Sequence, residues 1–81
     1  MEAGMSVRVH YVEGHGQEAR AGLSRLLATL GGRPGFLSAD LLGSPAQPDL
    51  CLLESRWGGE PPALELPPGC KGWTFVVERS L

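Results

Sequence analysis

The segment Leu50-Cys51-Leu52-Leu53 restricts the fold of this chain more than any other, because it is apolar at every position. Successive side chains of a β-strand point to opposite faces, so a strand with one face in water alternates apolar and polar residues. A strand that is apolar at both parities needs cover on both faces. The rest of the chain, or a partner, must supply the second cover.

Alternating apolar and polar residues predict four strands, over residues 6–12, 36–42, 50–57 and 72–79. In the first strand, one face holds Val7, Val9 and Tyr11. In the second strand, the alternation places Phe36 on the same face as Asp40. The alternation therefore predicts which residues of each strand share a face. It does not predict which of the two faces packs against the helix.

One helix is predicted over residues 17–30, where the apolar residues change to a helical period. Its apolar face consists of Ala19, Leu23, Leu26, Leu27 and Leu30. Gly22 interrupts this helix at a cost of roughly 1 kcal/mol relative to alanine, and the sequence gives no reason for it. The later segment GGEPPALELPPGCKG, residues 58–72, contains two pairs of prolines and permits at most one helical turn, near residues 63–66.

The expected element order is β-α-β-β-(short helix)-β, with an irregular segment as the alternative to the short helix, in a single domain over residues 1–81. This order predicts an α+β fold with a ferredoxin-like antiparallel sheet and its helices on one face. An uncovered apolar patch of ~400 Å² would be worth roughly 10 kcal/mol if buried, as an upper limit. Such patches mark interfaces or ligand sites. We expect a second copy of the chain to cover this face; the alternatives are a half-apolar face in water or docking on an unrelated protein.

The charge and composition of the chain exclude several classes of partner. The net charge is −2 and the basic residues are scattered, which argues against nucleic acid. No run approaches the ~20 apolar residues of a membrane span. The start of the chain, Met1-Glu2-Ala3-Gly4, lacks the features of a signal peptide, so a cytoplasmic location is expected. The two cysteines do not form a C-x-x-C motif, and a disulfide framework is not expected.

Two segments of the chain carry a family resemblance: RPGFLSADLL, residues 33–42, and LCLLESRW, residues 50–57. They resemble the antibiotic biosynthesis monooxygenase-like (ABM) family of dimeric α+β barrels, over roughly residues 6–57 and the last strand. In that family a Pro-Gly-Phe turn follows the first helix, and the next hairpin ends in a Glu/Ser-x-Trp signature, here Ser55-Arg56-Trp57. The resemblance implies a homodimer through the sheet face with a cleft for a small, flat aromatic molecule.

The resemblance also implies what chemistry to look for. Members include cofactor-independent quinone-forming monooxygenases and haem-degrading enzymes. The haem-degrading members use an Asn on the first strand and a His on the second helix. This chain contains no Asn, and no His follows His15, so no haem and no other cofactor is expected.

If the chain is an enzyme, the resemblance implies cofactor-free oxygenation of a phenol or quinol. His10 or Tyr11 would act as the base, and Trp57 would form the wall that orients the substrate. The alternatives are that His10 is a polar residue on a partly solvent-exposed face and that Trp57 packs at the edge of the core.

Asp40, Glu54 and Arg56 lie on adjacent predicted strands. The two carboxylates could do acid–base work in a cleft, with Asp40 and Arg56 contacting the ligand, but a surface ion-pair ladder is the preferred interpretation.

The remaining polar groups suggest weaker hypotheses. Gly14-His15-Gly16 precedes the helix and could hold an anion, but a flexible turn is the preferred interpretation. The spacing of the His and Cys residues matches no zinc pattern, so no metal is expected. We expect Cys51 to be a buried thiol, Cys70 to be more exposed and Trp73 to lie in the core. The sequence thus predicts a small ABM-like dimer that binds or oxygenates an aromatic molecule, or alternatively a non-catalytic ligand-binding or structural dimerisation module.

Overall fold

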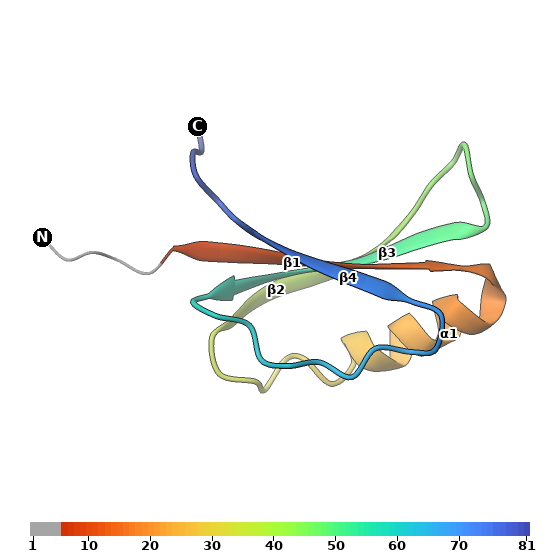
Figure 1. Ribbon diagram of the computed structural model, residues 1–81, viewed down its shortest axis with the longest axis horizontal. Helices are drawn as coiled ribbons and strands as arrows, with labels where there is room; N and C mark the ends of the chain where they lie inside the picture. Colours follow the sequence, from red (N-terminus) through yellow and green to blue (C-terminus); the bar gives the residue numbers. More distant parts are fainter. Residues whose placement is uncertain (1–5) are drawn as a thin grey trace, which may run out of the picture.

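The computed structural model describes residues 6–81 and contains a four-stranded antiparallel sheet with one helix packed against it (Figure 1). The elements in chain order are β1 Val7–His15, α1 Gly16–Leu27, β2 Phe36–Gly43, β3 Leu50–Gly58 and β4 Lys71–Val76. The strand order is β2-β3-β1-β4, which is consistent with a ferredoxin-like arrangement. The predicted α+β class is confirmed. Residues 1–4, on which the prediction about a signal peptide rests, lie outside the described residues.

The pairing register divides the strand residues between two faces. On the face toward α1, β1 and β3 align Arg8 with Trp57, His10 with Ser55, Val12 with Leu53 and Gly14 with Cys51. We call the opposite side the open face; the register assigns to it Val9, Tyr11, Glu13, Asp40, Leu42, Leu52, Glu54, Arg56, Lys71, Trp73 and Phe75.

One irregularity in β2 corrects the expected alternation. The register shifts between Phe36 and Ser38, as in a β-bulge, and Phe36 aligns with Trp57. The two rings pack edge to face, with centroids 5.5 Å apart. Because a bulge adds a residue to one strand, it changes which parity faces the core. Phe36 therefore lies with the core residues and not on the face of Asp40, where strict alternation placed it.

The core lies between α1 and the sheet. Its buried members are Val12, Leu23, Leu30, Cys51, Leu53 and Trp57. The helix ends at Leu27, earlier than predicted, but hydrogen bonds from Thr29 N–H to the Leu26 carbonyl and from Leu30 N–H to the Leu27 carbonyl continue the chain in a tighter turn. This turn keeps Leu30 fully buried, as the helical period had required.

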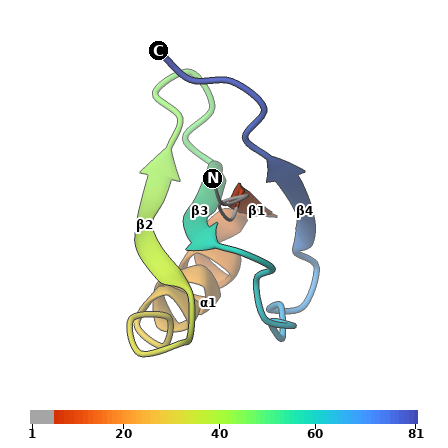
Figure 2. The ribbon, with the colours of Figure 1, turned by 90° about the vertical axis from the view of Figure 1, so that its left-hand side faces the viewer.

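Residues 59–70, which we call the strap, connect β3 to β4 on the same side of the sheet as α1 (Figure 2). The strap contains no helix, so the short helix expected near residues 63–66 is wrong. The flanking prolines favour an extended chain because they lack the N–H that a helix needs. Leu64 and Leu66 of the strap nevertheless pack against the core.

The contact between strap and helix explains Gly22. A Cβ atom at this position would lie 2.9 Å from Cβ of Pro67, closer than real Cβ contacts. Glycine is therefore required for the close approach of the strap, and this benefit offsets the loss of helix propensity.

Candidate functional site

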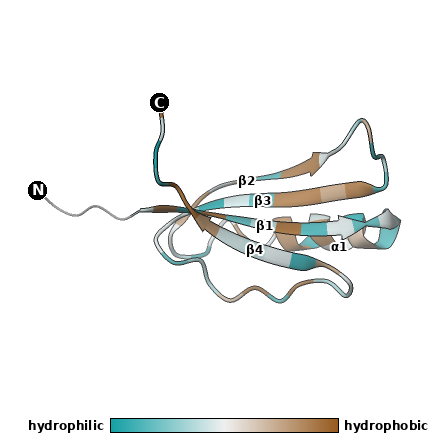
Figure 3. Ribbon diagram, turned by 45° about the horizontal axis from the view of Figure 1, so that its top comes forward, coloured by the Kyte–Doolittle hydropathy of each residue, from teal (hydrophilic) through white to brown (hydrophobic). Residues whose placement is uncertain are grey.

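Neither α1 nor the strap covers the open face, because both lie on the other side of the sheet (Figures 1 and 2), although Val9 at its centre is only 5% exposed. Figure 3 turns this face forward and shows the apolar first half of β3. Three large apolar side chains of this face are well exposed: Leu42 at 39%, Trp73 at 45% and Phe75 at 55%. The sequence-based expectation that Trp73 lies in the core is therefore wrong. The fold and this surface define a small α+β domain with one sheet face that no helix covers and that carries both large apolar and charged side chains.

Aromatic rings cluster on the β1–β4 half of the open face. Tyr11 packs edge to face against Phe75, with ring centroids 5.8 Å apart and planes at 71°. Tyr11 also aligns with Trp73 on β4. Three aromatic side chains thus lie next to one another on a surface that water reaches.

Charged groups occupy the β2–β3 half of the same face. Nη2 of Arg56 lies 3.6 Å from Oε2 of Glu54, and Asp40 aligns with Glu54 across the two strands. Glu54 aligns in turn with Tyr11 on β1. The structure therefore brings three of the predicted site residues, Tyr11, Asp40 and Arg56, to one face.

The other two predicted site residues, His10 and Trp57, lie on the opposite side of the sheet. Trp57 has no exposed surface, and its indole N–H donates a hydrogen bond to Oγ of Ser55 at 2.8 Å. This placement is that of a core residue with a satisfied polar atom, the alternative given above for Trp57.

His10 is half-buried near the strap. Its Nδ1 atom is buried without a hydrogen-bond partner in the described part of the chain. A Cβ at Gly72 would lie 3.3 Å from Nε2 of His10 and 3.2 Å from Cδ1 of Leu66 in the strap. Burial lowers the pKa of His10, because desolvation disfavours the charged imidazolium. His10 and Tyr11, the two candidate bases, thus point to opposite sides of the sheet.

A hollow of about 210 Å³, which we call the end pocket, lies where β1 ends and β4 begins. It is lined by Glu13, His15, Gly69, Lys71 and Trp73. Nε2 of His15 donates a hydrogen bond to Oε2 of Glu13 at 2.9 Å, since a carboxylate can only accept. The other ring nitrogen, Nδ1, lies 3.8 Å from Oδ2 of Asp49.

The end pocket was not among the sites predicted from the sequence. The available signal was the spacing of Glu13 and His15, two residues apart on one face of a strand. Lys71 is joined to them only through the pairing of β1 with β4, in which it aligns with Glu13.

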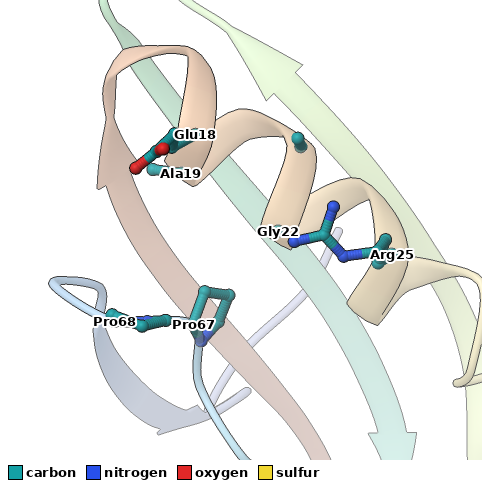
Figure 4. Close-up of a pocket in the computed structure, with 7 residues that line it drawn as sticks. Glu18, Ala19, Gly22, Arg25, Pro67 and Pro68 are labelled. Carbon is teal, nitrogen blue, oxygen red and sulfur yellow. The ribbon is translucent and has the colours of Figure 1, made fainter.

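A groove of about 380 Å³ runs between α1 and the strap (Figure 4). Glu18 and Arg25 border it on the helix side, and Pro67 and Pro68 border it on the strap side. Its lining offers two charged side chains and proline rings, with Glu18 as the one carboxylate and no Ser, Cys or His beside it. We assign no chemistry to it.

The two free cysteines lie near Gly14 on the covered side of the sheet. Cys51 is buried and aligns with Gly14, and Sγ of Cys70 lies 3.0 Å from where a Cβ of Gly14 would be. Burial and, secondarily, the neighbouring Cys51 raise the pKa of Cys70, which favours the protonated thiol over the thiolate. In residues 6–81 no group of three or more His, Cys, Asp or Glu side chains could hold a metal ion.

Comparisons of the chain with protein-family models, curated proteins and solved structures gave no match. Among the described residues, no helix is both long and apolar enough to cross a membrane.

Proposed function

We propose that this protein is a homodimeric module in which the open faces of two copies pack against each other, with a non-catalytic ligand-binding or structural role. The observation that supports this proposal most strongly is the exposure of Leu42, Trp73 and Phe75 on a face without cover in the described chain. Apolar surface of this kind, gathered on one face, marks an interaction site. The arrangement would be that of the dimeric α+β barrels of the ABM family, with a ferredoxin-like sheet and the strap in place of a second helix.

The size of the open face is sufficient for a specific dimer, though not for a very tight one. The strands contain 9, 8, 9 and 6 residues. At ~3.3 Å along a strand and ~4.8 Å between strands, the sheet presents about 500 Å² in each copy. Two copies would bury about 1,000 Å², near the lower limit of specific interfaces. We therefore expect a dimer that dissociates in the micromolar range.

The open face carries charges of both signs. This favours a second copy over a partner whose surface is uniformly positive or uniformly negative. Each copy has the guanidinium of Arg56 beside the carboxylates of Glu54 and Asp40. In a two-fold interface the same patch meets itself in reverse. Arg56 of one copy can then approach Asp40 of the other, so that opposite charges meet across the interface.

A binding or structural role is favoured over oxygenation by the positions of the candidate groups. Cofactor-free oxygenation of a phenol needs a base and an aromatic wall beside the same substrate. Tyr11 lies on the open face, whereas His10 and the buried Trp57 lie on the covered side. The cytoplasmic location expected from the sequence stays a prediction.

Oligomeric state in solution tests the proposal. Sedimentation velocity between about 0.1 and 100 μM should show a monomer–dimer equilibrium. Phe75→Ser should shift it to monomer. Val76→Ser is the matched control, because Val76 is 46% exposed on the same strand but aligns with Arg8 on the other face. A folded chain that stays monomeric over the whole range would overturn the proposal.

A further inference from the structure

We propose that the end pocket binds a single-ring aromatic carboxylate, with its ring against Trp73 and its carboxylate at Lys71. The proposal rests on the ligand-binding form of the function proposed above, and it names the class of ligand and the place where it binds. It differs from the sequence-based hypothesis, which assigned the aromatic contact to Trp57.

The aromatic wall of the pocket is Trp73. Its indole is 45% exposed and lines a hollow of about 210 Å³. A cavity of about 150 Å³ suffices for benzene, so this space fits one ring with a small substituent. At Gly69, on the rim, a Cβ would meet nothing within 4 Å, so the entrance beside the indole is open. A flat ring can therefore enter and stack on Trp73.

The cation of the pocket is Lys71, the only lysine of the chain. Within residues 6–81 it takes part in none of the ion pairs. Glu13, its cross-strand neighbour, instead accepts the hydrogen bond of His15. Lys71 is thus the positive group of the pocket that is free to pair with a ligand, and an ammonium is a strong partner for a carboxylate.

The chemistry of the lining residues favours a carboxylate over a phosphate. A phosphate carries more charge and is held by several donors, such as arginine forks or a row of backbone amides. The end pocket offers one lysine, one carboxylate (Glu13), one histidine whose Nε2 is already used by that carboxylate, and one indole face. With a single cation and a carboxylate already present, the pocket matches a ligand with one negative charge on one ring better than a multiply charged phosphate.

The position of the pocket connects it to the proposed dimer. Glu13, Lys71 and Trp73 belong to the open face by register. A second copy packed on this face would border the pocket and shield the bound ring from water. The residues that recognise the ligand all come from one copy, so the monomer is competent to bind it.

Benzoate is the probe for the test, and benzamide, with the same ring but no charge, is its control. Binding is measured by calorimetry and by tryptophan fluorescence, to which Trp73 contributes an exposed indole and Trp57 a buried one. We expect saturable binding of benzoate, about tenfold tighter than that of benzamide. Equal binding of the two probes, or no saturation by either, would overturn the proposal.

Variants at Lys71 and Trp73, with Arg25→Gln as a control, locate the site. Lys71→Gln should weaken benzoate binding about tenfold, to the level of benzamide, and Lys71→Arg should restore the preference. Arg25→Gln removes the same charge from the groove between α1 and the strap and should change nothing. Trp73→Leu should weaken the binding of benzoate and of benzamide by the same factor, as measured by calorimetry. Unchanged benzoate binding in Lys71→Gln, with the fold confirmed by circular dichroism, would refute the assignment.

The Phe75→Ser variant separates this proposal from the proposed function. If it is monomeric and still binds benzoate more tightly than benzamide, the end pocket is supported independently of the dimer. If the native chain is dimeric but does not distinguish the two probes, the ligand proposal fails and the dimer stands.

Discussion

The two tryptophans of this chain occupy opposite faces of one sheet and have opposite surroundings. Trp57 is fully buried, with its N–H bonded to Ser55 and its ring against Phe36. Trp73 is 45% exposed and has no cover among the described residues. The difference shows that the short chain completes only one of its two hydrophobic faces by itself. Folding uses the face of Trp57, and the face of Trp73 is the one that we propose for association.

The largest expected effect comes from truncating these two residues in parallel. Trp57→Ala should lower the free energy of unfolding by about 3–5 kcal/mol at every protein concentration, because it leaves a cavity in the core. The urea midpoint of a dimer rises with protein concentration, and Trp73→Ala should abolish this rise. Urea unfolding followed by circular dichroism at two concentrations about 100-fold apart measures both.

The control for this pair is the milder change to phenylalanine. Trp57→Phe keeps an aromatic ring and should fold even if Trp57→Ala does not. Its loss of unfolding free energy should be smaller and again independent of protein concentration. The division of the sheet into a folding face and an associating face would be contradicted in two cases. Either the loss of stability in the Trp57 variants depends on protein concentration, or the urea midpoint of Trp73→Ala still rises with concentration as in the native chain.

The next effect is smaller and concerns the contact between the strap and α1. Gly22→Ala should lower the free energy of unfolding by about 1 kcal/mol. Alanine favours the helix, but its Cβ would lie 2.9 Å from Cβ of Pro67 and would push the strap away. Thermal or urea unfolding measures the change. Ser24→Ala, at an exposed position of α1, is the control and should be neutral or slightly stabilising. A stabilised Gly22→Ala would mean that the strap does not press on the helix.

The strands and the helix could be predicted because their apolar periods are local properties of the sequence. Alternation shows which residues of a strand share a face, but not which of the two faces the helix will cover. For this reason the grouping of Val9 with Tyr11 was correct, whereas Trp73 was placed in the core. The bulge near Phe36 and the role of Gly22 depend on contacts with a neighbouring strand and with the strap, which no local pattern records.

The candidate site was harder to predict for the same reason. Tyr11, Asp40 and Arg56 are brought to one face as their parities allowed, because cross-strand pairing preserves the alternation. The end pocket joins Glu13 and His15 at the end of β1 with Lys71 at the start of β4. Only the β1–β4 register brings these distant segments together, and a single sequence does not reveal that register.

The smallest expected effect belongs to His10, on the covered side of the sheet. Burial lowers its pKa below the value of 6.5 that it has when exposed, so the unfolded chain binds this proton more readily than the folded one. The contribution of His10 to stability is therefore fully present above pH 6.5 and is lost as the pH falls through the lowered pKa of the folded state. Urea unfolding from pH 7.5 to 5 measures this loss, and His10→Gln should remove it from the profile. If the native chain and His10→Gln lost stability in parallel on acidification, His10 would be hydrated in the folded state, and the side of the sheet under the strap would be as open to water as the face of Trp73.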